Sequence, residues 1–133
     1  MKDTFHFVSM LDGKDHHLIM ASLDVESLFT NIPLDETIDI VTNKVYGKKR
    51  KVKGIWKSDF RKLLVMSTQG TVFYYDGHYY RQKDGVAMGS PLGPALANAF
   101  LCHHEASWLD GCPLSYAPIF FARYVDDIFV LIR

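Results

Sequence analysis

Two acidic clusters, each set in apolar, strand-like sequence, constrain this chain more than any other feature. Asp24 lies in Ser-Leu-Asp-Val-Glu-Ser-Leu-Phe (residues 22–29), and Asp126 and Asp127 lie in Arg-Tyr-Val-Asp-Asp-Ile-Phe (residues 123–129). The clusters are 102 residues apart (126 − 24). A carboxylate moved from water into apolar surroundings is costly unless it is paired or binds a cation. The pattern therefore predicts a fold that brings the three carboxylates to a common cation site.

Composition places the chain among globular proteins. Its 133 residues, 48% of them hydrophobic, suit one domain or part of one, with a packed core. We find no apolar run of about eighteen residues, so no membrane-spanning helix is expected, and no signal-peptide layout at the start. Cys102 and Cys112 lack a metal-type spacing, so both thiols are expected to stay unpaired in a reducing, intracellular compartment.

The charges are unevenly distributed although the net charge is zero. Residues 44–62 hold nine of the fifteen Lys and Arg residues and one acid, Asp59, which leaves −8 (6 − 14) for the rest of the chain. A basic lobe on an acidic body suits a protein that holds phosphates in one place and metal ions in another. A solvated, lysine-rich helix-loop-helix explains the same charges equally well.

The periodicity of apolar residues predicts an α+β fold. Faces made by Ile38, Val41, Thr42 and Val45, and by Phe60, Leu63 and Leu64, are expected to point inward. The predicted elements are a helix over 4–11, a buried strand over 17–23 that delivers Asp24, a helix over 34–46 opened by Pro33, a basic loop over 47–54, a helix over 59–67 capped by Ser58, an aromatic hairpin over 71–82, a loop over 85–94, a helix over 94–109, and strands over 119–124 and 128–132.

The aromatic hairpin is the clearest local signal in the chain. Val-Phe-Tyr-Tyr and His-Tyr-Tyr flank Asp76-Gly77, a dipeptide typical of two-residue hairpin turns. The rings could stack on nucleobases. A structural role, in which the rings pack, is the preferred interpretation.

The carboxylates suit magnesium, which prefers oxygen ligands. Asp24 at the end of its strand is expected to face Asp126 in the tight turn and to supply bridging ligands, with Asp127 peripheral and the Val25 carbonyl adding a further oxygen. Two such ions lie about 3.5–4 Å apart in two-metal sites. An Asp pair that merely forms a hairpin turn is the structural alternative.

Three segments resemble the motifs of reverse transcriptases. Residues 21–38 resemble motif A, residues 82–100 resemble motif B, and residues 123–129 resemble motif C, in the order typical of that family. Within these motifs, the segments Phe-Thr-Asn-Ile-Pro, Met-Gly-Ser-Pro and Ala-Asn resemble the Penelope-like retroelement branch, which is related to telomerase. The resemblance covers almost the whole chain and all three motifs.

The resemblance implies a polymerase palm, with an antiparallel sheet and helices packed on one face, in a partial right-hand fold. The activity implied is RNA-templated DNA synthesis, in which a primer 3′-hydroxyl attacks the α-phosphate of a deoxynucleotide. The implied cofactor is two Mg²⁺ ions, with Mn²⁺ able to substitute. The implied partners are an RNA template, a DNA primer and deoxynucleoside triphosphates, in an intracellular and nuclear location without a membrane. The oligomeric state is not predicted.

The same resemblance divides the chain into segments of one partial reverse transcriptase domain. These are a fingers-to-palm connection (1–17), the motif A strand and helix (18–46), the basic helix-loop and aromatic hairpin (47–82), the motif B loop and helix (83–109), and the motif C hairpin (119–133). Upstream fingers motifs, strands after motif C, a thumb and an endonuclease domain are expected to be missing. The chain alone is therefore expected to be inactive or weak.

The resemblance also assigns roles to single residues. Asp24, Asp126 and Asp127 become the catalytic metal ligands. Phe29 is expected to lie under the sugar and exclude a 2′-hydroxyl, although an ordinary core aromatic is the alternative.

In motif B, Gly89 and Ser90 would let the backbone approach the nascent base pair, because glycine removes the side-chain barrier. Met88 stands where many reverse transcriptases have Gln, so the nucleotide contact there is expected to differ.

Candidate nucleic-acid contacts come from polar residues outside the three aspartates. The basic run of Lys48, Lys49, Arg50, Lys51 and Lys53 fits template phosphates, a nuclear localisation signal or a solvated loop, with the solvated loop preferred. In motif B, Gln82 and Lys83 either reach the template or are ordinary surface residues.

Two other function classes remain open from the sequence. One is an inactive reverse transcriptase-like relic that still binds nucleic acid. The other is a metal-dependent nuclease, which ranks low because Phe29 and the 88–91 loop have no role in it. The end of the last strand, residues 131–133, is expected to expose an edge that could pair with another chain.

Overall fold

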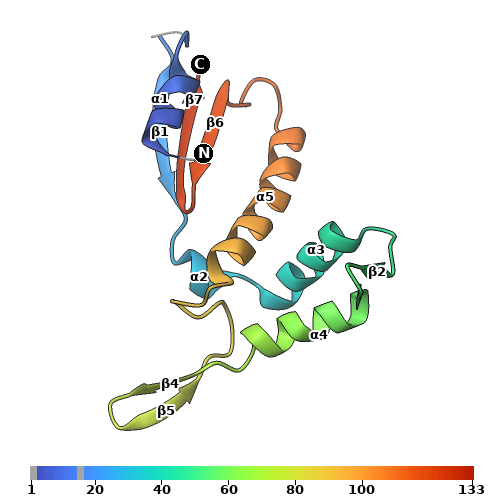
Figure 1. Ribbon diagram of the computed structural model, residues 1–133. Helices are drawn as coiled ribbons and strands as arrows, with labels where there is room; N and C mark the ends of the chain where they lie inside the picture. The colour runs from blue at the N-terminus through green and yellow to red at the C-terminus, as the bar shows by residue number, and fades with distance from the viewer. Residues whose placement is uncertain (1–2, 15–16) are drawn as a thin grey trace. The chain divides into compact units, whose positions relative to one another are not determined.

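The computed structural model describes residues 3–14 and 17–133, in which helices and short antiparallel strands alternate (Figure 1). The α+β class predicted from the sequence is confirmed. The predicted connection over 1–17 lies partly outside the described residues, and its described part forms a helix. In chain order the elements are α1 (Thr4–Leu11), β1 (Ile19–Asp24), α2 (Leu28–Asn31), α3 (Leu34–Tyr46), β2 (Lys51–Val52), β3 (Ile55–Trp56), α4 (Lys57–Thr68), β4 (Val72–Tyr75), β5 (His78–Arg81), α5 (Gly93–Gly111), β6 (Phe120–Tyr124) and β7 (Asp127–Ile132).

The chain divides into two compact units. The first consists of Met1–Glu26 with Ala106–Arg133, and the second of Ser27–Glu105. The three-stranded sheet and α1 belong to the first unit, whereas α2, α3, α4 and both small hairpins belong to the second. Across residues 3–14 and 17–133, no helix is long and apolar enough to span a lipid bilayer.

The sheet of the first unit has the order β1-β7-β6, with antiparallel pairing throughout (Figure 1). The β7 strand is central, because β1 and β6 take one edge of it each. Leu131 within it is only 4% exposed. The free edge expected at residues 131–133 is therefore wrong, since β7 pairs on both sides.

Helix α1 lies against this sheet through aromatic contacts. The Phe7 ring meets Phe129 edge-on, with ring centroids 5.0 Å apart. Phe120 packs beside Phe129 at 6.3 Å, and the Lys14 ammonium sits 5.4 Å from the Phe120 ring centroid. The helix begins where the Asp3 carboxylate accepts a hydrogen bond from the His6 amide at 2.8 Å, a typical N-cap. Its bounds match the predicted helix over 4–11.

Strand β1 differs from its prediction. It ends at Asp24 as expected, but five of its six residues are exposed, among them Ile19, Met20 and Leu23. The strand lies at the edge of the sheet, where only β7 pairs with it. The apolar run was predicted to be buried, and that prediction is wrong for the described chain.

The second unit is built on the antiparallel pair α3 and α4 (Figure 1). Helix α3 spans the predicted residues 34–46, and Ile38 and Thr42 are buried as expected. Val45 is 47% exposed, so its predicted inward orientation is wrong, and buried Tyr46 takes its place at this end of the helix. On α4, Leu64 is buried whereas Leu63 is 53% exposed, which corrects the prediction that both face inward.

The predicted basic loop over 47–54 forms part of a small hairpin. Strands β2 and β3 pair with Lys51 opposite Trp56 and Val52 opposite Ile55. Helix α4 follows at once and begins at Lys57. Ser58 therefore lies inside the first turn of α4, and its predicted role as N-cap is wrong.

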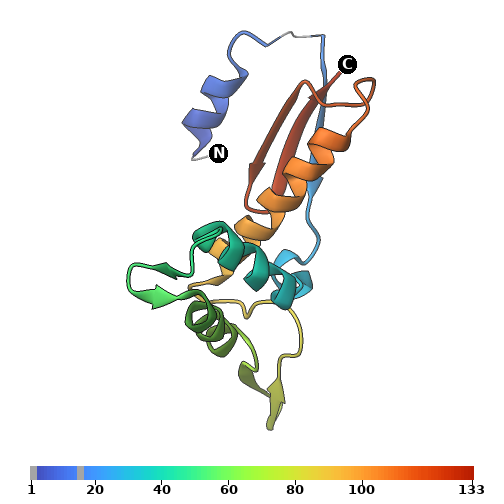
Figure 2. The same cartoon turned by 90° about the vertical axis from the view of Figure 1, so that its right-hand side faces the viewer.

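The aromatic hairpin forms in the predicted register but is exposed to solvent. Asp76 (φ 47°) and Gly77 (φ 78°) form the turn, as expected for a two-residue hairpin in which both turn residues have positive φ. All eight residues of β4 and β5 are exposed. The hairpin projects from the helices of its unit (Figures 1 and 2). The packing that was preferred over base stacking is found between rings of the hairpin itself, with centroids 5.6 Å apart for Phe73 and Tyr80 and 5.1 Å apart for Tyr74 and Tyr79.

Two neighbouring leucines on α4 test this packing directly. We expect Leu64→Ala to lower the free energy of unfolding by about 2–5 kcal/mol, because it opens a cavity in the core. We expect Leu63→Ala, the same chemical change at an exposed position, to stay within about 0.5 kcal/mol. Urea unfolding of both variants measures the difference. Equal losses would show that both side chains are packed.

Candidate active site

The three aspartates come together at one end of the sheet in the first unit. Asp24 is the last residue of β1, and the antiparallel register places it directly opposite Asp127, the first residue of β7. Side chains opposite each other in such a pair have Cβ atoms about 4.5–5.5 Å apart and share a sheet face. Beyond this pair, the Val25 amide donates a hydrogen bond to the Asp126 carbonyl at 3.1 Å.

The register corrects one detail of the sequence-based prediction. Asp126 was expected to face Asp24, with Asp127 peripheral. The structure places Asp127 opposite Asp24 and leaves Asp126 in the two-residue turn between β6 and β7. The shift by one position matters because successive side chains in a strand point to opposite faces.

The turn that carries Asp126 has unusual backbone geometry. Val125 has φ 56°, in the left-handed region that branched side chains rarely adopt. Such a residue costs on the order of 1–3 kcal/mol and persists only where the surroundings fix it. Here the Arg123 guanidinium donates a hydrogen bond to the Val125 carbonyl at 2.7 Å, and the β6–β7 pairing closes the turn.

The carboxylates are more accessible than the sequence suggested. Asp24 and Asp127 are exposed, and Asp126 is half-buried. The premise that apolar flanking sequence buries them is wrong, because the flanking strands β1 and β7 end at this edge of the sheet. Their charges are therefore stabilised by solvent and do not require a cation for folding.

Hard oxygen donors at this sheet end nonetheless fit magnesium. Among the described residues, no three His, Cys, Asp or Glu side chains are gathered closely enough to hold a metal ion by themselves. Magnesium does not require such a group, since it usually keeps several waters and takes one or two carboxylates plus substrate phosphates. The opposed pair Asp24 and Asp127 supplies two carboxylates, and Asp126 in the adjoining turn supplies a third.

A pocket in the second unit gathers the residues predicted to contact a nucleotide. Phe29, Met88, Gly89 and Ser90 all line it, although Phe29 is about sixty positions away in the sequence. Its volume is about 280 Å³, and Ala87, Gly93 and Pro94 complete the lining. The structure thus brings these four candidates into one concave site.

Two glycines that were not predicted as site residues lie close to Phe29 or its neighbour Thr30, and one of them, Gly93, lines the pocket. A Cβ on Gly85 would lie 2.4 Å from the Thr30 carbonyl oxygen, and Gly85 also has φ +75°. Next to it, the Val86 amide donates to the Phe29 carbonyl at 2.7 Å. A Cβ on Gly93 would touch the Phe29 ring at 3.5 Å. The Asp84-Gly85 dipeptide signals a turn, but no local pattern reveals the approach to α2.

The remaining candidates lie on the surface of the second unit. Lys48, Lys49, Arg50, Lys51 and Lys53 are all exposed. Lys83 is exposed as well. The Gln82 side-chain amide donates to the Asp84 carbonyl at 2.9 Å, so it stabilises its own loop.

Comparisons with known proteins give one family and one fold. The sequence matches the family model described as "Reverse transcriptase (RNA-dependent DNA polymerase)" over residues 1–133. The structure of apo telomerase from Candida tropicalis, truncated from its C-terminal domain, is similar with a TM-score of 0.60 and 15% sequence identity. The match covers 86% of this chain and 24% of that one, so the chain spans about a quarter of its length. A comparison with curated proteins found no match.

The close approach at Gly85 gives a matched pair of variants. Gly85→Ala and Gly70→Ala both place a Cβ at a left-handed residue, with φ +75° and +73°, but only Gly85 would meet other atoms. We expect Gly70→Ala to cost about 1–2 kcal/mol from the backbone alone. Gly85→Ala should cost about 1–3 kcal/mol more, because the overpacked contact must shift. Thermal and urea unfolding measure both, and equal costs would contradict the close approach.

Proposed function

Because the chain belongs to the reverse transcriptase family, we propose that it synthesises DNA on an RNA template by nucleotidyl transfer, as the palm of a retroelement enzyme. The observation that carries the proposal is the pairing of Asp24 with Asp127 beside Asp126 in the turn. The match of the family model along the whole chain supports it. We also propose that it belongs to the Penelope-like branch, because the segments Phe-Thr-Asn-Ile-Pro and Met-Gly-Ser-Pro resemble that branch.

The proposed reaction forms one bond and breaks one. The primer 3′-oxygen bonds to the α-phosphorus of a deoxynucleoside triphosphate, pyrophosphate leaves, and the hydroxyl proton passes to solvent. Asp24, Asp126 and Asp127, with the Val25 carbonyl, would hold two Mg²⁺ ions, or Mn²⁺ in their place. The ions would supply charge neutralisation at the attacking and leaving oxygens. The carboxylates themselves would fix the positions of the positively charged ions, and the paired ends of β1 and β7 hold these carboxylates in place.

The pocket in the second unit suits the incoming nucleotide. Phe29 provides a flat ring beside a backbone that Gly89 and Gly93 leave uncovered. We propose that this ring excludes a ribose 2′-hydroxyl and so favours deoxynucleotides. Met88, which is 78% exposed at the rim, offers an apolar contact where many relatives have the amide of Gln.

The proposed partners follow from the reaction. They are an RNA template, a DNA primer and deoxynucleoside triphosphates, with Gln82 and Lys83, which precede the pocket residues 87–90 in the chain, as candidate template contacts. A nuclear location would suit this activity.

A second candidate is a relic that binds nucleic acid without synthesis. The observation that favours it is the exposed run of Lys48, Lys49, Arg50, Lys51 and Lys53, which suits phosphate binding and needs no catalytic metal. The two candidates differ in one measurable property, the incorporation of nucleotides.

Primer extension on an RNA template tests the proposal in the longest natural chain that contains these residues. We expect Asp126→Asn to lower kcat/KM by roughly 10²–10⁴-fold, because metal ions stabilise the transition state by several kcal/mol. Asp24→Asn and Asp127→Asn should each show a comparable loss.

The matched control is Asp110→Asn, which removes an exposed carboxylate from the end of α5 in the same unit. It should leave the extension rate unchanged. No incorporation by the unaltered protein, with nucleic-acid binding retained, would reject the polymerase and support the relic.

The selectivity role of Phe29 has its own test. Phe29→Ala should raise the ratio of ribonucleotide to deoxynucleotide kcat/KM by roughly 10–200-fold, as expected when about 1–3 kcal/mol of discrimination is removed. Phe29→Tyr keeps the ring and should keep the ratio near that of the unaltered protein. Steady-state incorporation of matched nucleotide pairs measures it, and an unchanged ratio in Phe29→Ala would place the selectivity elsewhere.

A further inference from the structure

The hairpin formed by residues 48–56, here the basic hairpin, concentrates positive charge on an ordered element. Lys48, Lys49, Arg50, Lys51 and Lys53 fall within six positions, and all are exposed. The sequence favoured a solvated loop at this place. The structure instead shows strands β2 and β3 paired after Arg50, with Lys51 in β2 and Lys53 in the turn. The Lys49 amide donates to the Tyr46 carbonyl at 2.8 Å, so backbone hydrogen bonds also hold the residues that precede β2.

The basic hairpin is attached to the core of its unit by side chain and backbone. The Tyr46 hydroxyl, on a residue only 3% exposed, donates to the Ile55 carbonyl at 3.1 Å. The Lys57 amide donates to the Arg50 carbonyl at 2.9 Å. The Tyr46 ring in turn packs against Phe60 at 5.5 Å between centroids. These contacts fix β3 to the end of α3, and Arg50, the residue before β2, to the start of α4.

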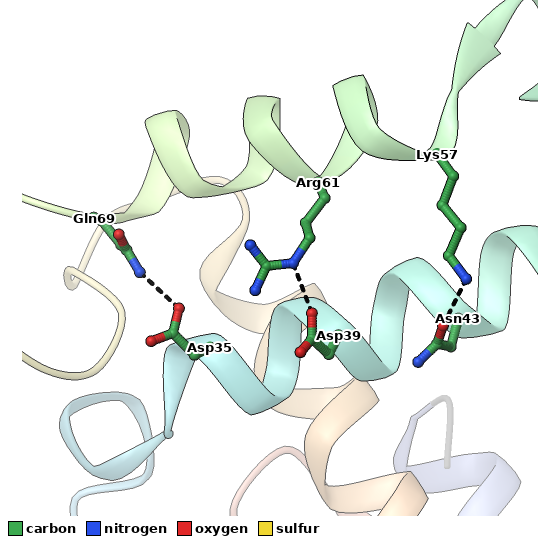
Figure 3. A network of polar contacts seen from close by, with 6 residues as sticks. All are labelled: Asp35, Asp39, Asn43, Lys57, Arg61 and Gln69. Carbon is green, nitrogen blue, oxygen red and sulfur yellow. Dashed lines mark hydrogen bonds and ion pairs between the residues drawn. The ribbon is translucent and has the colours of Figure 1, made fainter.

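Polar partners compensate the charges between α3 and α4, but they do not extend to the cations of the basic hairpin. Three polar contacts join α3 to α4, and Figure 3 shows them as successive rungs. They are Gln69 with Asp35 at 2.9 Å, Arg61 with Asp39 at 2.8 Å, and Lys57 with Asn43 at 2.8 Å. The hydrogen bond and charge of Asp39 raise the pKa of Arg61, so that cation is matched by an anion.

At the basic hairpin, by contrast, no anion pairs with the described cations. In the part of the chain that the structure describes, the side chains of Lys48, Lys49, Arg50 and Lys53 make no hydrogen bond or ion pair. Only Lys51 has a partner, the half-exposed ring of Trp56, with the ammonium 5.3 Å from its centroid. Like charges held this close repel one another, and a polyanion would remove that repulsion.

We propose that the basic hairpin binds the phosphate backbone of RNA or DNA without reading its sequence. The inference deepens the proposed function and rests on it, because that function supplies the polyanion. Lys and Arg side chains on a fixed scaffold neutralise phosphates and release their counterions. The exposed indole of Trp56 adds a ring on which an unpaired base can stack.

The test uses fluorescence anisotropy of the 133-residue chain with a random-sequence RNA–DNA hybrid and with single-stranded RNA. The variant carries Lys48→Gln, Lys49→Gln, Arg50→Gln and Lys53→Asn, since Asn tolerates the positive φ of residue 53. Loss of four phosphate contacts should make the negative slope of log K against log salt shallower by about 3. Between 50 and 200 mM salt, binding by the unaltered chain should then fall roughly 60-fold more than binding by the variant.

Two controls separate position from charge. Replacing Lys48, Lys49 and Lys53 by Arg keeps the charge and should keep both affinity and slope. Lys49→Gln with Arg50→Gln should make that slope shallower by about 1.5, whereas Lys14→Gln with Arg133→Gln, two cations of the other unit, should leave it unchanged. Unfolding curves confirm that the variants are folded. An unchanged slope in the folded four-site variant overturns the proposal.

Further measurements test alternative ligands of the basic hairpin and distinguish a failure of this proposal from a failure of the proposed polymerase reaction. Binding of the unaltered chain to anionic lipid vesicles or to a nuclear import receptor, without binding to the hybrid or to RNA, would also overturn the proposal. Asp126→Asn should lower kcat/KM for DNA synthesis by roughly 10²–10⁴-fold yet leave the anisotropy titration unchanged. Failure of the polymerase reaction and failure of the basic hairpin therefore give different results.

Discussion

The pairing of β1 with β7 is the interaction on which the candidate active site depends. It joins residues more than a hundred positions apart in six successive pairs, from Ile19 with Ile132 to Asp24 with Asp127. A slip by one residue would turn Asp24 to the opposite face of the sheet from Asp127. The acidic site is therefore a property of register, and the strand β7, paired on both edges, fixes that register.

Local signals were sufficient for several elements. Pro33 and the apolar spacing after it predicted α3 correctly, and Asp76-Gly77 predicted the hairpin turn, because these patterns act within a few residues. Burial was less predictable. The sequence could not show that β1 lies at an edge, that Leu63 faces solvent beside buried Leu64, or that the aromatic hairpin is exposed.

The candidate site shows the same division. The three aspartates, Phe29 and the 88–90 loop were identified from motifs, and the structure places Phe29 with that loop in one pocket. The pairing of Asp24 with Asp127, rather than with Asp126, depends on long-range register. Gly85 was not predicted as a site residue. Glycine is required there because a Cβ would meet the Thr30 carbonyl, and no spacing along the chain reveals that contact.

The exposed hairpin of β4 and β5 has a consequence for handling the protein. A two-stranded ribbon with solvent on both faces is marginally stable, so its amide hydrogens should exchange quickly. Its strands combine high β-propensity with few charges and no proline, and each has an unpaired outer edge. Such a segment is a template for cross-β stacking. In a concentrated solution this ribbon, more than the acidic sheet end, sets the chain's tendency to aggregate.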